Sequence, residues 1–294
     1  MYAHIQEEVT KTELAGAVLG LCRATGVSRS GYYRWQSKAT PPPLEAMQLQ
    51  HAIQEIALER PAYGYRRVTE ELRHRGWEAN HKRVLRLLRQ DNLLCVRKQG
   101  WVRTTDSHHG LPVYPNLARG LVLTAPDQLW VADITYIRLQ SEFVYLAVIL
   151  DAYSRRVIGW NLGRSLETEL ALTALRHALA QRTVPAGLVH HSDRGVQYAS
   201  QLYTDLLRQF GITISMSRRG NPYDNAYAES FMKTLKHEEV HRYQYRNLEE
   251  AQERIERFIE TVYNHQRLHS ALGYISPMQF EANLETRTAT QRQA

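Results

Sequence analysis

Cysteine is scarce in this chain of 294 residues, and the two cysteines lie far apart, at Cys22 and Cys95. Neither belongs to a CxxC pattern, so the sequence supports neither a disulfide framework nor a cysteine-based zinc site. Long apolar runs are also missing, since none approaches the length of a membrane span. The first residues, MYAHIQEEVTKTE, have neither the basic start nor the apolar stretch of a signal peptide. These absences predict a cytoplasmic protein.

The net charge of +7 is concentrated in the N-terminal part of the chain. Residues 1–120 contain 18 Lys and Arg against 11 Asp and Glu, whereas residues 121–294 contain 19 of each class. Because phosphate contacts come from clustered Lys and Arg, this distribution is typical of a nucleic-acid-binding module joined to a neutral enzyme domain. A basic surface that serves only solubility is the alternative.

Chain length and turn residues divide the sequence into several parts. A chain this long exceeds the usual single domain, so we expect a catalytic-sized domain and one or two small ones. Three consecutive prolines at 41–43 indicate an extended linker. The expected parts are a helix-turn-helix-like segment (1–38), the Pro-rich linker (39–44), a helical DNA-binding domain (45–102), a connector (103–126), a catalytic domain (127–285) and a disordered tail (286–294).

The helical domain contains a pattern typical of a helix-turn-helix. We expect one helix over 68–75, a turn at Gly76, a cap at Asn80 and a second helix over 81–91. A basic second helix fits the motif that enters a major groove. A small helical bundle with solvated cations is the alternative. The candidate DNA contacts in this domain are Arg66, Arg67, Lys82, Arg83, Arg86 and Arg89.

From residue 127 the pattern changes from helical periodicity to strands. Three strands come first, and the segments after them alternate between helix and strand. The expected strands are 129–139, 142–151, 155–162, 187–191 and 212–215, and the expected helices are 167–181, 200–210, 225–240 and 248–264. The order βββαβαβα predicts an α/β fold in which a mixed sheet is flanked by helices.

Three carboxylates in this part are candidates for a metal site. Asp133 and Asp193 lie at the ends of expected strands, and Glu229 shares a helix face with Lys233 and Lys236. Carboxylates without cysteine or paired histidine form an oxygen site suited to Mg²⁺, with Mn²⁺ as a substitute. Two such ions activate an attacking oxygen and stabilise a leaving one at phosphorus. The residues therefore predict phosphodiester chemistry.

The sequence around these carboxylates is specific. It includes WVADITY (130–136), DAYSR (151–155), HSDRGVQY (191–198), GNPYDNAYAESF (220–231) and YNHQRLH (263–269), preceded by SRSGYYRW (28–35) and YGYRR (63–67). These motifs resemble the DDE transposases of bacterial insertion sequences, in particular the catalytic OrfB-type product of the insertion-sequence-three family. The resemblance covers nearly the whole chain.

The resemblance implies an RNase H-like integrase core in which Asp133, Asp193 and Glu229 hold the metal ions. The family cuts DNA at the ends of its element and joins the released 3′-hydroxyl to another strand. DNA is therefore the expected partner, and the nucleoid is the expected place within the cytoplasm. The resemblance also implies that Lys236 lies near substrate DNA, and Lys233 is a further candidate contact.

Three more residues within the motifs are candidates for supporting the metal site or touching DNA. They are Tyr136, His191 and Asn225, and buried packing is the alternative for each.

The resemblance also implies an assembly. Two element ends must be joined, so we expect a homo-oligomer, at least a dimer, on DNA. The family's full transposase usually carries an upstream OrfA-type portion with a leucine zipper, whereas residues 1–44 contain no heptad run of the needed length. An OrfA-type partner or fusion is therefore a candidate requirement for activity.

Two rival functions remain open in the sequence. HEEVH at 237–241 satisfies HExxH, so a zinc metallopeptidase would use His237, His241 and Glu260 as ligands and Glu238 as base. The basic N-terminal part would have no role in a peptidase. A non-catalytic DNA-binding regulator explains the basic part but leaves the three carboxylates without a use.

Overall fold

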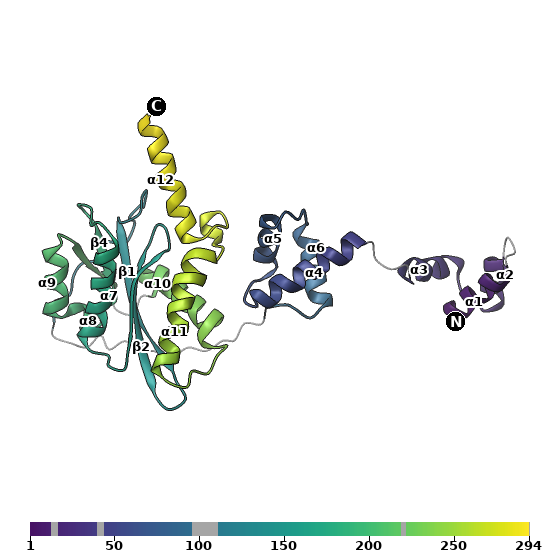
Figure 1. Cartoon of the computed structure of the whole chain (residues 1–294), viewed down its shortest axis with the longest axis horizontal. Coiled ribbons are helices and arrows are strands. Elements are labelled where there is room, and N and C mark those ends of the chain that lie inside the picture. The colour runs from purple at the N-terminus through teal and green to yellow at the C-terminus, as the bar shows by residue number, and fades with distance from the viewer. Residues whose placement is uncertain (13–16, 40–43, 96–110, 219–221, 294) are drawn as a thin grey trace.

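The computed structural model describes residues 1–12, 17–39, 44–95, 111–218 and 222–293 (Figure 1). Figure 1 shows three groups of elements: a first group of helices, a second group of helices, and an α/β part. Among the described residues, no helix is both long and apolar enough to cross a membrane.

The first group of helices packs around a small apolar cluster. It consists of α1 (Tyr2–Thr12), α2 (Ala17–Ala24) and α3 (Arg29–Ala39). Ile5, Cys22 and Tyr32 are its buried members. The Ser28 hydroxyl caps α3 by accepting from the backbone N–H of Gly31 at 3.0 Å. The helix-turn-helix-like segment predicted over 1–38 thus contains the pair α2 and α3, preceded by the further helix α1.

The second group forms a compact helical unit. It consists of α4 (Leu44–Glu59), α5 (Tyr65–His74) and α6 (His81–Gln90). Gly76 turns the chain between α5 and α6 with a φ of +84°, a conformation that favours glycine. Asn80 caps α6, as predicted, by accepting from the backbone N–H of Lys82 at 2.8 Å. The described part of the predicted connector, residues 111–126, contains neither helix nor strand.

A five-stranded sheet in the order β3-β2-β1-β4-β5 forms the centre of the α/β part. The β1-β2 and β2-β3 pairs are antiparallel, and the β1-β4 and β4-β5 pairs are parallel. The mixed sheet predicted from the βββαβαβα order is therefore confirmed. The strands are β1 (Leu129–Arg138), β2 (Phe143–Asp151), β3 (Val157–Gly163), β4 (Val189–Ser192) and β5 (Thr213–Met216).

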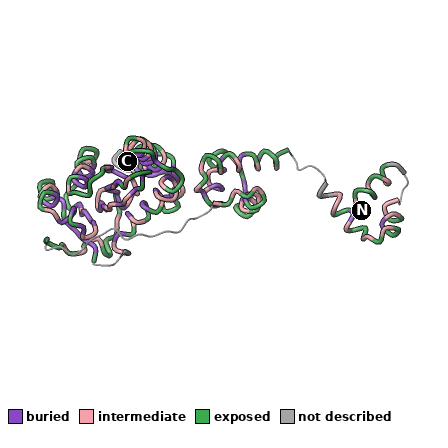
Figure 2. The backbone as a smooth tube through the Cα atoms, turned by 90° about the horizontal axis from the view of Figure 1, so that it is seen from below, coloured by how far each residue is buried: buried purple, intermediate pink, exposed green. Residues whose placement is uncertain are grey.

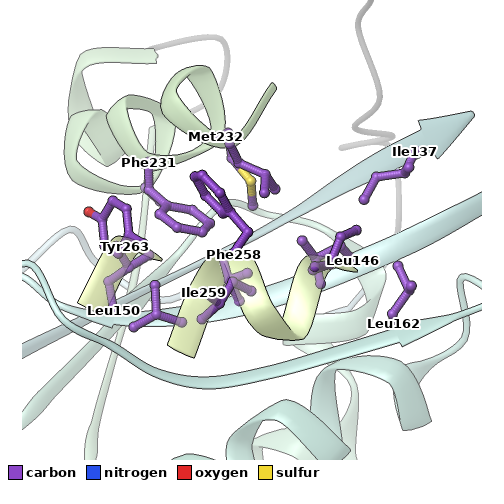
Figure 3. Packing of buried hydrophobic residues seen from close by; sticks show 14 of the residues in the cluster. Ile137, Leu146, Leu150, Leu162, Phe231, Met232, Phe258, Ile259 and Tyr263 are labelled. Atoms are coloured by element: carbon purple, nitrogen blue, oxygen red, sulfur yellow. The ribbon is translucent and has the colours of Figure 1, made fainter. Parts of the chain in front are cut away.

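Helices cover both faces of the sheet, so its strands are buried on both sides (Figures 1 and 2). The helices of one face are α7 (Thr168–Gln181), α8 (Val196–Ala199) and α9 (Gln201–Gln209). The helices of the other face are α10 (Ala226–Leu235), α11 (Leu248–Glu256) and the π-helical segment η3 (Arg257–Gln266). Figure 3 shows Phe231 and Met232 packed near Phe258 and Ile259 above the strands. This packing attaches the Glu229 helix to the sheet.

The C-terminal half differs from the predicted elements in three places, one of which is the helix expected over 248–264, now divided into α11 and η3. The helix expected over 225–240 is divided into a short 3₁₀ turn η1 (Pro222–Asn225), α10, and a π-helical segment η2 (Lys236–Val240). The disordered tail predicted over 286–294 is corrected, because α12 (Pro277–Gln293) continues through it. The tail has no Gly or Pro, and its Ala, Gln and Arg residues are good helix formers. A second 3₁₀ turn, η4 (Ser270–Leu272), precedes α12.

Candidate active site

Asp133 and Asp193 occupy equivalent positions on two neighbouring parallel strands. Val131 of β1 pairs with His191 of β4, and each aspartate lies two residues further along. Parallel strands lie about 4.8 Å apart, so the two aspartates are adjacent. Asp133 was expected at a strand end, but β1 continues past it and pairs on its other side with β2, where Asp133 lies opposite Val148. Only Asp193 follows the end of its strand.

The electrostatics of Asp133 place all three carboxylates in one site. Burial, together with the negative charges of Asp193 and Glu229, raises the pKa of Asp133 to about 8. The backbone N–H of Ile134, which donates to Asp133 Oδ1 at 2.9 Å, and the cation of Lys236 act in the opposite direction. The three predicted carboxylates, from β1, the end of β4 and α10, therefore lie near enough for their charges to interact.

Asn225 links the Glu229 helix to β1. Its side chain is buried, and Nδ2 donates at 3.0 Å to the carbonyl oxygen of Ala132, the residue before Asp133. Since Asn225 directly precedes α10, this bond fixes the start of the helix against the strand. Its Oδ1 is buried without a hydrogen-bond partner in the described part of the chain. Asn225 is thus buried, as the packing alternative expected, and its role in supporting a metal site stays a prediction.

Glu229 and Asp193 are each held by a local contact. Lys233 Nζ lies 3.4 Å from Glu229 Oε2, one helical turn away on α10. The backbone N–H of Gly195 donates to Asp193 Oδ1 at 2.9 Å. Both carboxylates keep partial exposure, so a ligand can reach them from solvent.

Lys236 lies between the carboxylates and an aromatic ring. Its Nζ is 4.7 Å from the centroid of the Tyr136 ring, a cation–π contact. Burial lowers the pKa of Lys236, and the charge of Asp133 opposes that shift. Tyr136 thus supports Lys236 three residues after Asp133 on the same strand.

His191 packs inside the protein. It is fully buried, and its two ring nitrogens lie 2.8 Å from Ser215 Oγ and 3.0 Å from Ser217 Oγ. The expectation that it touches DNA is therefore corrected, and the packing alternative holds. It joins β4 to the end of β5 beside the site.

The donor set suits a hard divalent cation, although it is not a closed metal cage. Within the described ranges, no three His, Cys, Asp or Glu side chains already lie close enough together to hold an ion. Three carboxylates and the unpartnered amide oxygen of Asn225 are all oxygen donors. Oxygen donors of this kind are what Mg²⁺ and Mn²⁺ prefer.

The candidate DNA contacts of the helical unit divide into two groups. Lys82, Arg86 and Arg89 are exposed on α6, Arg83 is partly exposed there, and Arg66 is exposed beside the Tyr65 ring. Arg67 is different, because its Nε donates at 3.1 Å to the carbonyl oxygen of Leu268 in the α/β part. Its predicted role at DNA is therefore corrected to a contact between domains. Sequence could not show this, since 201 positions separate the partners.

The HExxH residues do not form a zinc site. Glu238 is paired with Arg267 at 2.8 Å, and Glu260 accepts from Trp160 Nε1 at 2.9 Å. His237 Nε2 lies 3.3 Å from Cys95 Sγ. Each of these three residues is thus directed to a different partner.

Comparisons with known proteins agree with this geometry. The Integrase core domain family matches residues 124–222 and 210–277, and the HTH-like domain family matches residues 45–100. The insertion element IS600 uncharacterized 31 kDa protein of Shigella sonnei is 42% identical over 88% of this chain and 97% of its own length. Transposase InsF for insertion sequence IS3A of Escherichia coli (strain K12) is 35% identical over 93% of this chain and 96% of its own length.

This chain belongs to the insertion-sequence-three family of transposases. The transposase is accordingly a polynucleotidyl transferase with an integrase core, a class that typically uses divalent metal ions. Among solved structures, the catalytic core domain of BIV integrase is similar over 55% of this chain and 99% of that chain, at 16% identity and a TM-score of 0.40. None of these similarities favours a zinc metallopeptidase.

Several motif residues of the transposase have structural roles that were not predicted. Buried Asp151 accepts from the backbone N–H groups of Asp127, Tyr153 and Ser154 and so shapes the turn after β2. Buried Asn264 accepts from the N–H of Val157 and donates to its carbonyl oxygen, both at 3.0 Å. The family motifs contain these residues, but only the contacts show that they shape the scaffold.

Proposed function

We propose that this transposase cleaves DNA at the ends of its insertion sequence and joins the 3′-hydroxyl to target DNA, with Asp133, Asp193 and Glu229 as ligands of two divalent cations. The observation that carries the proposal is the pairing of β1 with β4, which sets two aspartates side by side next to the Glu229 helix. Mg²⁺ is the expected ion, with Mn²⁺ as a substitute.

The raised pKa of Asp133 supports a cation site. Burial and neighbouring negative charge disfavour the ionised form, and positive charge beside the carboxylate restores it. Bound divalent ions supply activation of the attacking oxygen and stabilisation of the leaving oxygen at phosphorus. The chain's own contribution is to hold the three carboxylates at one site, with Asn225 fixing α10 against β1.

Basic residues supply the DNA contacts in this proposal. Lys236, supported by Tyr136, and Lys233 lie beside the carboxylates, where a phosphate of the scissile strand would be bound. The exposed cations of α6 bind a second stretch of DNA, in the manner of a helix in a groove. In this proposal, the DNA bound beside the carboxylates and the DNA bound by α6 both belong to the element end.

Assembly follows from the reaction. Two ends must meet for strand transfer, so we propose a homo-oligomer, at least a dimer, on DNA. An upstream OrfA-type portion, as a partner or a fusion, is the proposed supplier of further end recognition.

The test is strand cleavage and joining on labelled DNA that carries the element's ends, with Mg²⁺ or Mn²⁺. We expect Glu229→Gln to abolish both steps, because it removes a charged ligand while keeping the side-chain shape. Glu260→Gln is the matched control: Gln can still accept from Trp160, but it would disable the peptidase ligand set. Full activity of Glu229→Gln, or a Zn²⁺-dependent peptidase activity lost in Glu260→Gln, would overturn the proposal.

A further inference from the structure

The α/β part inserts a leucine into the core of the helical unit. Leu268, which follows η3, is 5% exposed and belongs to the same buried cluster as Ile53, Val68 and Leu88 of α4–α6. Its backbone is held from both sides: its N–H donates to Tyr63 Oη at 3.0 Å, and its carbonyl oxygen accepts from Arg67 Nε at 3.1 Å. A buried side chain with both backbone groups bonded indicates a specific docking contact.

A buried ion pair lies directly behind this leucine. Arg267 Nη2 is 2.8 Å from Glu238 Oε1, and the two side chains are only 5% and 9% exposed. Arg267 Nε also donates to Glu238 at 3.0 Å, so two nitrogens of Arg267 bond the same carboxylate. The neighbouring His237 meets Cys95 of the helical unit. The HExxH stretch is thus part of the surface of the α/β part that contacts the helical unit.

This contact surface continues into the candidate active site. Glu238 belongs to the π-helical segment η2, whose first residue is Lys236. Lys236 lies on the Tyr136 ring and interacts with the charge of Asp133. Segments of π-helix are often found at functional sites. An unbroken series of packed and bonded groups therefore joins the helical unit to the carboxylates.

We infer that Leu268 and the Glu238–Arg267 pair are specificity-determining residues, because they hold the DNA-reading helix α6 in a fixed position relative to the carboxylate site. A DNA end bound to α6 is then presented to Asp133, Asp193 and Glu229 in one register, whereas other DNA reaches them only by chance. The inference rests on the proposed function. It assigns the HExxH stretch a use that neither the transposase motifs nor the peptidase alternative provides.

The geometry favours a fixed position over a loose tether. A tether would need only exposed polar contacts, which contribute little and exchange freely with water. Here docking removes the apolar side chain of Leu268 from water and pairs both of its backbone groups with the helical unit. The docked arrangement is therefore preferred to alternatives that expose Leu268.

Two variants undock the domains from opposite sides. Leu268→Asp places a charge in the apolar cluster of the helical unit, and Tyr63→Phe removes the hydroxyl that accepts from Leu268 while keeping the ring. Leu272→Ala is the control, a similarly buried leucine four positions further on that is not a member of that cluster. In Leu268→Asp, hydrogen exchange at residues 266–269 reports undocking, since the amide of residue 268 is bonded to Tyr63 only in the docked state. Tyr63→Phe removes that acceptor directly, so undocking in this variant is judged by the activity ratio.

The activity readout is the ratio of cleavage on DNA with the element's own end to cleavage on a scrambled sequence. We expect Leu268→Asp to exchange faster at 266–269 and both undocking variants to lower this ratio by about 5- to 150-fold, the usual span of coupling between two sites. Leu272→Ala should keep the wild-type ratio. An unchanged ratio in undocked protein overturns the inference, and so does an equal loss on both DNAs or unchanged exchange in Leu268→Asp.

Failure of the proposed function gives a different pattern. Wild type that cleaves neither DNA contradicts that function, and coupling is then measured without catalysis. We expect end DNA to slow hydrogen exchange over residues 229–241 in wild type and not in Leu268→Asp. The same response in both proteins would overturn the inference.

Discussion

Asn225 shows how one buried amide controls the geometry of the site. Its bond to the Ala132 carbonyl is the direct connection between the strand of Asp133 and the helix of Glu229. In the proposed metal site, the two carboxylates would have to be held to a fraction of an ångström, and this bond is what fixes one relative to the other.

Replacing Asn225 by Ala should lower strand cleavage about 10- to 100-fold, the usual effect of removing a residue that orients metal ligands. The control is Asn247→Ala, which removes the cap of α11 and costs about 1 kcal/mol of stability. We expect Asn247→Ala to keep its activity. Cleavage rates and urea unfolding of both variants provide the comparison, and equal activity in the two would show that Asn225 only stabilises the fold.

Buried His190 makes stability depend on pH. Burial, together with the neighbouring His191, lowers its pKa to about 3, and its Nε2 lies 3.0 Å from Tyr203 Oη. The unfolded chain takes up this proton near pH 6.5, whereas the folded chain stays neutral down to about 3. The unfolded state therefore binds more protons in this window, and stability falls as pH decreases.

The expected slope for this one group is about 1.4 kcal/mol per pH unit below pH 6.5. His190→Gln should lose that contribution, measured as urea unfolding at pH 7, 6 and 5. If the free energy of unfolding changed with pH equally in His190→Gln and wild type, His190 would not be the source of this pH dependence.

At the level of elements, β3 and α7 approach each other closely at one glycine. A Cβ on Gly159 would lie 2.2 Å from the carbonyl oxygen of Ala174 and 2.9 Å from Ala178 Cβ. The Ala174 carbonyl oxygen is part of the backbone and cannot move aside as a flexible side chain can, so position 159 can carry no side chain.

Gly159→Ala should therefore destabilise the fold by about 1–3 kcal/mol through overpacking. Gly163→Ala is the matched control at the end of the same strand, where the added Cβ meets only the flexible Leu170 Cδ1 at 3.2 Å. The midpoints of urea unfolding measure the loss of stability in the two variants. A larger loss for Gly163→Ala would contradict the packing argument.

The two π-helical segments are elements that only long-range contacts fix. Asn264 on η3 bonds both backbone groups of Val157 on β3, and Glu238 on η2 pairs with Arg267. Irregular hydrogen bonding along a helix is tolerated when such contacts hold the side chains in place. Both segments accordingly lie where the chain touches the sheet or the helical unit.

At the level of the whole molecule, the exposed cations of α6 lie in the helical unit, whereas the three candidate carboxylates lie in the α/β part that contacts it. The exposed cations of α6 and the carboxylate site are joined through Leu268. Phosphate contacts make DNA affinity depend on salt, with a slope that falls by about 0.9 for each contact removed.

Arg86→Ala should weaken binding to all DNA sequences and reduce the salt slope by about 0.9. Arg73→Ala is the control, because Arg73 lies on α5 and is paired with Glu70. Fluorescence anisotropy over a series of salt concentrations measures both slopes. An unchanged slope in Arg86→Ala would remove α6 from the DNA surface.

The sequence by itself determined most of the elements and the family. Alternation and apolar spacing located the five strands and most of the helices around them, because these patterns depend on local residue order. Residue types pointed to candidate carboxylates, and the motifs around Asp133, Asp193 and Glu229 identified the family. Asn80 was likewise recognised as a cap, because it acts two residues along the chain.

Only the tertiary structure decided which distant residues meet. The pairing of Val131 with His191 set Asp133 beside Asp193, and Arg67 turned away from the predicted DNA surface to bind Leu268. Glu238, a base in the HExxH reading, became the partner of Arg267. A side chain's partner across the fold depends on how sheets and helices pack, and no local pattern in the sequence encodes that choice.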